Sequence, residues 1–384
     1  MSLTEIQIMI KKILKIICFV LVCVMTFSFF SCAAMGDENS SDSNSDSDFA
    51  SGSDFTFNNT EKSETKVTTK QTQKSTNNNS SNSNNSNDGK NAIVKGYILS
   101  ASTPNDTYGN GMFMVYKLSD GRLLVFDGGN ASVKDFFIAA LKKIAGVNKP
   151  KIAAWVVTHE HGDHYGALIE YYYKNGATIN QVLEIEEIWM NPVGNEGKGI
   201  EKHFRNAFPT AKIRNLTYGE EFTLDKIKIT VLSTPDKIIS KSGVDVNSYS
   251  LVMMLNIGGK KILMTGDANA PTWDFMLDQQ KNGEKFSLKC DYLQVPHHGV
   301  HAAGTTAGYN AADAKYLVIP STIDLANKLT TSTNAGPSYA LYKKHGINVG
   351  NLTTETDNET YWFAGCYGKS GTQDIKCFFT YKGN

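Results

Sequence analysis

The pattern of apolar and polar positions divides the chain into three regions of different character. A short apolar run ends near residue 30, and it is followed by a long segment made almost entirely of Ser, Asn, Asp, Thr, Lys and Gly. Such a polar segment cannot bury enough apolar surface to offset the entropy lost on ordering. We therefore expect residues 1–32 to be a targeting segment, residues 33–90 a disordered linker, and residues 91–384 the folded domain.

Apolar runs in the third region alternate between strand-like and helical spacing. The expected strands cover residues 112–118, 122–126, 152–157, 227–232, 250–257, 261–264, 292–295 and 316–319. The expected helices cover residues 132–147, 167–173, 199–208, 271–280 and 339–344. Strands with helices between them favour an α/β domain in which helices cover sheets.

The N-terminal run has the features of a secretory signal. Three lysines, Lys11, Lys12 and Lys15, precede the apolar residues. The run of about 15 residues is shorter than the roughly 20 that a membrane-spanning helix needs. It ends in Ser31-Cys32, which resembles the lipobox of bacterial lipoproteins. We expect a lipid anchor at Cys32 on the extracellular face of the bacterial cell membrane; an uncleaved anchor helix and simple secretion are the alternatives.

Charge and cysteine content exclude some classes of protein. The 38 basic residues balance 38 acidic ones, so bulk positive charge is not available for binding nucleic acid, although a local basic groove remains possible. Six cysteines in a chain of this length do not make a disulfide scaffold. Cys366 and Cys377 flank an expected C-terminal hairpin, either as a disulfide or as two thiols.

Histidines are concentrated in two stretches that each follow an apolar run. The chain has 8 histidines, and these stretches hold His159, His161, His164, His297, His298 and His301. A scattered distribution would not produce this clustering, which indicates a site where imidazoles act together.

The first stretch has the residue types of a metal site. His159, His161, Asp163 and His164 lie within six residues of one another, directly after the strand expected to end at residue 157. Imidazole nitrogens and carboxylate oxygens bind Zn, Mn or Fe, and Gly162 permits the sharp turn that convergence needs. We expect the two leading histidines to face one ion and the other two residues a second ion. A polar surface loop is the alternative interpretation.

The motif His-x-His-x-Asp-His after an apolar strand resembles the signature of the metallo-β-lactamase superfamily. Three further elements follow in the family's order: Asp127-Gly128-Gly129, Thr265-Gly266-Asp267 and Pro296-His297-His298-Gly299. The segment that begins at Asn247 is most similar to the soluble domain of ComEC/Rec2-type competence proteins. The resemblance covers most of residues 92–384 and implies a four-layer αββα sandwich.

The resemblance implies two divalent metal ions, Zn or Mn. Their implied ligands are His159, His161, Asp163, His164, Asp267 and His297. Of these, His159 and His161 would bind the first ion, and Asp267 would bridge both. A helix cap is the alternative role for Asp267.

Supporting roles are also implied by the resemblance. Asp127 would orient a ligand histidine, or else only cap the hairpin end. Many relatives supply a third histidine to the first ion, and this chain has none between residues 233 and 247, so water or Asn247 would complete that site. Asp163 would orient the nucleophile, and His298 would contact the substrate or its leaving group. The reverse assignment makes His298 the ligand and leaves His297 near the substrate.

Two cations bound close together lower the pKa of a water that bridges them, and the resulting hydroxide attacks phosphorus or a carbonyl carbon. The resemblance implies a metal-dependent hydrolase, a phosphodiesterase or nuclease acting on DNA or RNA, and the N-terminal segment places it outside the cell, tethered to the membrane. A phosphorylcholine or teichoic-acid esterase is the alternative enzyme. A non-catalytic surface binding lipoprotein is the alternative of another class. No protein partner is expected.

Overall fold

Two sheets form the framework of the folded region. The computed structural model describes residues 93–101, 112–283, 286–299, 303–321, 323, 326–327, 336–353, 359–363 and 373–383. The expected signal segment with Cys32, the linker, His301 and Cys366 lie outside the described residues.

The first sheet has eight strands in the order β15-β1-β2-β3-β4-β6-β7, with β5 paired to β4. These strands are β1 (Ile93–Ala101), β2 (Phe113–Lys117), β3 (Leu123–Asp127), β4 (Lys151–Val156), β5 (Glu184–Ile185), β6 (Glu187–Trp189), β7 (Lys212–Arg214) and β15 (Gln373–Lys382). All of β4 after Lys151 is buried, as a central parallel strand requires.

The second sheet has seven strands in the order β14-β13-β12-β11-β10-β9-β8. They are β8 (Glu221–Leu224), β9 (Ile227–Ser233), β10 (Val252–Ile257), β11 (Lys260–Met264), β12 (Tyr292–Gln294), β13 (Tyr316–Ile319) and β14 (Tyr361–Phe363). In both sheets an antiparallel group leads into a parallel group: β1 to β3 and then β4, and β8 to β11 and then β12.

The described α-helices connect these strands. They are α2 (Lys134–Ala145), α3 (Gly162–Asn175), α4 (Ile179–Val182), α5 (Gly194–Ala207), α6 (Pro235–Ile238), α7 (Ala270–Lys281), α8 (Thr306–Ala312) and α10 (Pro337–Lys344). None of the helices in the described ranges is long and apolar enough to cross a membrane.

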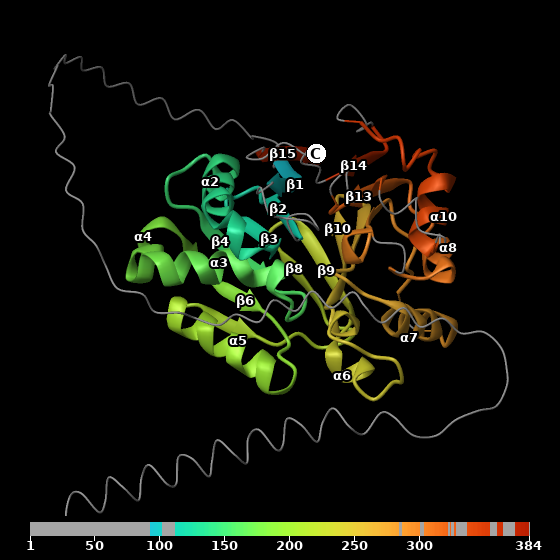
Figure 1. Cartoon of the computed structure of the whole chain (residues 1–384), viewed down its shortest axis with the longest axis horizontal. Helices are drawn as coiled ribbons and strands as arrows, with labels where there is room; N and C mark the ends of the chain where they lie inside the picture. Colours follow the sequence, from blue (N-terminus) through green and yellow to red (C-terminus); the bar gives the residue numbers. More distant parts are fainter. Residues whose placement is uncertain are drawn as a thin grey trace, which may run out of the picture. The chain divides into compact units, whose positions relative to one another are not determined.

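Figure 1 shows the two sheets with helices on their outer faces, and three apolar clusters hold these layers together. The first lies between the first sheet and helices α2, α3 and α5, and Trp155 and Phe204 belong to it. The second lies between the two sheets. The third lies between the second sheet and helices α7, α8 and α10, and includes Trp273 and Tyr342. The expected αββα sandwich is therefore confirmed.

This arrangement determines where the residues of the histidine and aspartate motif can come together. In each sheet, the first parallel pair follows the antiparallel group: β3 with β4 in the first sheet, and β11 with β12 in the second. The carboxyl ends of these pairs are therefore equivalent positions in the two sheets. In open α/β sheets such strand ends form the ligand-binding edge. Both histidine stretches and both acidic elements of the motif follow these four strand ends.

Candidate metal centre

The first histidine stretch runs from the end of β4 directly into α3. Val157 continues the sheet by donating its backbone N–H to Trp189 O at 2.9 Å. Helix α3 then begins at Gly162, so Asp163 and His164 lie in its first turn. The expected start of this helix near residue 167 is wrong, because the motif itself forms the first turn. Asp163 thereby sits at the electropositive end of the helix.

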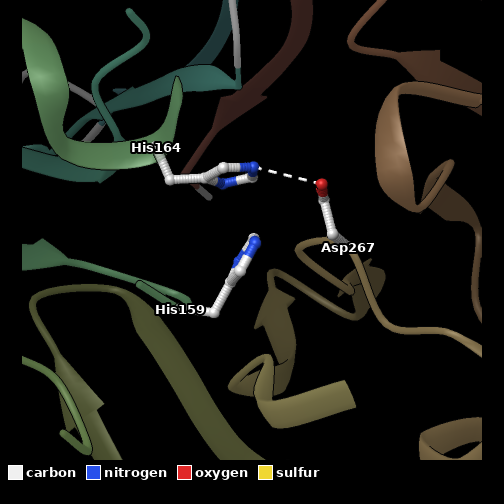
Figure 2. A group of neighbouring side chains, drawn as sticks. All are labelled: His159, His164 and Asp267. Carbon is white, nitrogen blue, oxygen red and sulfur yellow. Dashed lines mark ion pairs between the residues drawn. The ribbon is translucent and has the colours of Figure 1, made fainter. Parts of the chain in front are cut away.

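Side chains of the first stretch meet Asp267 from the second sheet. His159 Nε2 lies 3.0 Å from His161 Nδ1, which is hydrogen-bond distance. His161 belongs to neither ligand group found among the described residues, so its role as a ligand stays a prediction. His164 Nε2 lies 3.2 Å from Asp267 Oδ2. Figure 2 shows His159 and His164 pointing toward Asp267 from the opposite sheet. One ligand atom from each of these three residues falls within 4.8 Å of the others.

A second group forms around His298. Its Nε2 lies 3.0 Å from Asp163 Oδ2 and 3.4 Å from Asp267 Oδ2. Ligand atoms of Asp163, His164 and His298 lie within 4.8 Å of one another. Since His164 belongs to both groups and Asp267 contacts both, the two groups form one continuous cluster.

The donor atoms fit bound cations. Among the described residues, His164 Nε2, Asp267 Oδ1 and His298 Nε2 are buried without a hydrogen bond. Buried polar atoms left without partners are costly, and here all three belong to the same cluster. Imidazole nitrogens with carboxylate oxygens are a donor set that binds Zn or Mn, so the residues present match the group that the motif implies.

The surroundings shift the pKa values of the histidines in this cluster in different directions. Burial alone would lower the pKa of His164, but the carboxylates of Asp267, Asp127 and Asp163 raise it well above its ordinary value. Burial also opposes protonation of His298, yet Asp267 and Asp163 raise its pKa to about 10. Burial and the neighbouring His164 instead hold the pKa of His159 well below its usual range. A cation would take the place of these protons and release them.

Asp127 contacts the cluster through the ring nitrogen of His164 that does not face Asp267. It is fully buried, and its Oδ2 lies 2.9 Å from His164 Nδ1. A carboxylate can only accept, so His164 donates from Nδ1 and directs Nε2 toward Asp267. Oδ1 of Asp127 also accepts the backbone N–H of Thr158 at 2.8 Å. This is the contact expected of a residue that orients a ligand histidine.

We expect Asp127→Asn to weaken metal affinity by about 10- to 100-fold. Asparagine keeps the shape and tolerates the left-handed backbone at this position, where φ is 56°, but it is a weaker acceptor for His164. The measurement is competition with a chromogenic chelator. The matched control is Asp225→Asn, because Asp225 also has a positive φ, 53°, and accepts from Ser119 N and Oγ. Equal losses in both variants would contradict an orienting role.

Two hydroxyl groups that the motif did not reveal hold His159. Thr158 Oγ lies 3.1 Å and Ser250 Oγ 3.4 Å from His159 Nδ1. Ser250 Oγ also accepts the backbone N–H of Asp267 at 3.0 Å. Ser250 thus connects the ligand turns of the two sheets. Both residues lie in segments that were singled out from the sequence, but no feature of the sequence assigned a role to their hydroxyl groups.

The structure favours His298 over His297 as the ligand, contrary to the prediction. Both residues have positive φ, 47° and 51°, so the turn His297–Gly299 is tightly bent. His298 Nδ1 lies 3.0 Å from Pro320 O, which directs its Nε2 into the cluster. His297 is partly exposed and belongs to neither ligand group. His298 therefore moves from the expected substrate contact into the cluster.

Asn247 lies in the short turn Asn247–Tyr249 that precedes Ser250. Its side chain is buried, and its Oδ1 has no hydrogen bond among the described residues. Its expected place beside the first ion stays a prediction. The Cys366–Cys377 pairing also stays a prediction, since Cys366 lies outside the described residues.

Comparison with a family model decides the family. The model of the metallo-beta-lactamase superfamily matches residues 106–303, which is more than half of the chain. The chain belongs to the metallo-beta-lactamase superfamily. It is accordingly a metal-dependent hydrolase, with the ligand groups described above in the place where such a site is expected.

Solved structures similar to this superfamily member share little sequence with it. YhfI from Bacillus subtilis, a metallo-beta-lactamase fold protein, is 13% identical with a TM-score of 0.41, covering 64% of this chain and 94% of its own. Yeast PDE1 is 12% identical with a TM-score of 0.41, covering 74% and 100%. A diphosphatase from the PhnP family is 13% identical with a TM-score of 0.36, covering 72% and 96%. Such low values say nothing of the substrate. Curated proteins give no match to the sequence.

Proposed function

We propose that this domain hydrolyses phosphodiesters with two divalent cations, Zn or Mn. The cations would be held by His159, His161, Asp163, His164, Asp267 and His298. The observation that carries the proposal is the convergence of three buried atoms from both sheets, His164 Nε2, Asp267 Oδ1 and His298 Nε2, which have no hydrogen bond among the described residues. When bound, such a pair of ions activates water and neutralises charge on substrate oxygens.

The charge of the site is compatible with an anionic substrate. The charge of two divalent cations would exceed that of Asp127, Asp163 and Asp267 together, while ligand histidines are neutral. The negative charge of a metal-activated hydroxide would balance that excess, so the site would not repel an anionic phosphodiester. DNA and RNA are the first substrates to consider.

Exposure assigns different roles to the carboxylates. The side chain of Asp163 is 33% exposed, whereas that of Asp267 is 2% exposed. Substrate and water can therefore reach Asp163, which would orient the attacking water by accepting a hydrogen bond from it. Asp267 would act only as a ligand. His297, which is partly exposed beside the cluster, would contact the leaving group.

A substrate panel with purified protein tests this proposal. We expect cleavage of bis-p-nitrophenyl phosphate and of plasmid DNA or RNA that depends on added Mn or Zn and is lost in His161→Ala. His203→Ala is the matched control, because His203 is a helix α5 residue that contacts Tyr173. Hydrolysis of a phosphorylcholine ester alone would redirect the substrate assignment. Turnover of nitrocefin without phosphodiester cleavage would overturn it.

We further propose that the domain works outside the cell, tethered through lipid on Cys32. The support is the basic segment, the apolar run and the Ser31-Cys32 sequence at its end. In cells, Cys32→Ser should move the protein from the membrane fraction to a soluble one. Unchanged membrane attachment would favour an uncleaved anchor helix instead.

A further inference from the structure

Gln294 lies where strands β11 and β12 separate. The two strands pair at Ile262 with Tyr292 and at Leu263 with Leu293. Beyond these pairs, β11 leads into the turn that carries Asp267, and β12 leads into the turn that carries His298. Gln294 is the last residue of β12 and is fully buried. A buried amide needs several hydrogen bonds to be satisfied, so its partners define its role.

Both ends of this amide bind the backbone of the ligand turns. Its Oε1 accepts the backbone N–H of Thr265 at 2.7 Å. Its Nε2 lies 2.9 Å from both Gly266 O and Val295 O. The hydroxyl of Thr265 donates a hydrogen bond of 2.8 Å to the backbone oxygen of Gln294. The side chain thus replaces the missing backbone ladder between the turns that carry Asp267 and His298.

The Asp267 turn is confined on its other side as well. Gly266 has a φ of 54°, and a Cβ there would come within 2.9 Å of Thr158 Cβ and 3.0 Å of Ser250 Oγ. His297 N also donates to Gly266 O at 3.2 Å. Thr158 and Ser250 confine the turn on one side. On the other side, the amide of Gln294 acts together with the bond from His297 N to Gly266 O to fix how far Asp267 stands from the His298 turn.

We infer that Gln294 is a positioning residue that sets the separation of Asp267 and His298 and thereby the affinity of the metal centre. This inference rests on the proposed metal site. Residues that orient ligands from behind typically change metal affinity by about 10- to 100-fold when replaced. Gln294 touches no substrate, and it acts through the backbone of the two turns.

The test compares two variants of Gln294 with a matched amide elsewhere. Gln294→Met keeps the volume but removes the polar amide, and Gln294→Glu keeps the acceptor for Thr265 N but loses the donor to Gly266 O. Asn327→Leu is the control, since Asn327 also binds backbone groups, those of Gly350 and Leu352, which belong to no ligand turn. The readouts on purified protein are Co²⁺ affinity, the visible spectrum of the Co²⁺-loaded protein, and the melting temperature with chelator.

We expect both Gln294 variants to fold, to lose about 10- to 100-fold in Co²⁺ affinity and to show a changed Co²⁺ spectrum. Asn327→Leu should lower the melting temperature while keeping affinity within about twofold. Wild-type affinity and spectrum in both Gln294 variants would overturn the inference. Loss of cooperative folding in both would also overturn it, because Gln294 would then hold the fold and not the site. A wild-type chain that binds no metal overturns the proposed function itself.

Discussion

Replacing Asp267 by asparagine is expected to reduce metal-dependent phosphodiester hydrolysis roughly a thousandfold. Asp267 is 1% exposed and is the carboxylate that both ligand groups face. Loss of its charge removes several kcal/mol of cation binding, and each ~1.4 kcal/mol corresponds to about a tenfold change in rate. The measurement is the rate with bis-p-nitrophenyl phosphate, together with metal content by elemental analysis.

The substitution should leave the fold intact. The backbone N–H of Asp267 donates to Ser250 Oγ, and asparagine keeps that contact. Asp274→Asn, on the exposed side of helix α7, is the control for a lost negative charge nearby. If Asp267→Asn retained full metal content and full activity, the two-cation site would be wrong. The alternative role of a helix cap is not seen, because Asn269 is the N-cap of α7 and no side chain in the described part of the chain caps that helix.

The adjacent histidines of the turn His297–Gly299 should respond very differently to replacement. We expect His298→Ala to lose one bound ion and roughly a hundredfold or more in hydrolysis, because its Nε2 faces Asp163 and Asp267. His297→Ala should keep both ions. It should also keep most activity toward p-nitrophenyl esters, whose leaving group needs no proton, and lose activity toward DNA.

This pair of variants differs by one position and needs no further control for local backbone strain, since both residues have positive φ. Metal content of the two purified proteins decides the assignment. Loss of an ion in His297→Ala and full metal content in His298→Ala would restore the assignment made from sequence.

The sequence predicted those features of the fold that depend on local patterns. Strands β4, β9 and β13 and helix α2 follow from apolar runs and turn residues, and each was placed within a few residues of its observed bounds. Strand β1 was missed; it pairs with its neighbour β2 and also with β15 at the far end of the chain. Pairing between such distant segments leaves no local signal.

The candidate site was also predicted only in part, where local sequence motifs specify it. Order and spacing of the motif were sufficient to bring Asp267 together with His159 and His164, which the structure confirms as neighbours. The choice between His297 and His298 depends on Pro320 O, a backbone group that no motif specifies. The roles of Gln294 and Ser250 were not predicted either, because both side chains bind backbone groups of turns that follow other strands.

The ligands come from turns at the ends of two separate sheets, so cations bound there would join the two halves of the sandwich. Binding to the folded state alone stabilises it by about 2.7 kcal/mol when free metal is about a hundred times the dissociation constant. At the proposed extracellular location, the domain would meet proteases that cut chains when they open. The supply of metal in the surroundings would then govern how long the protein survives as well as how fast it works.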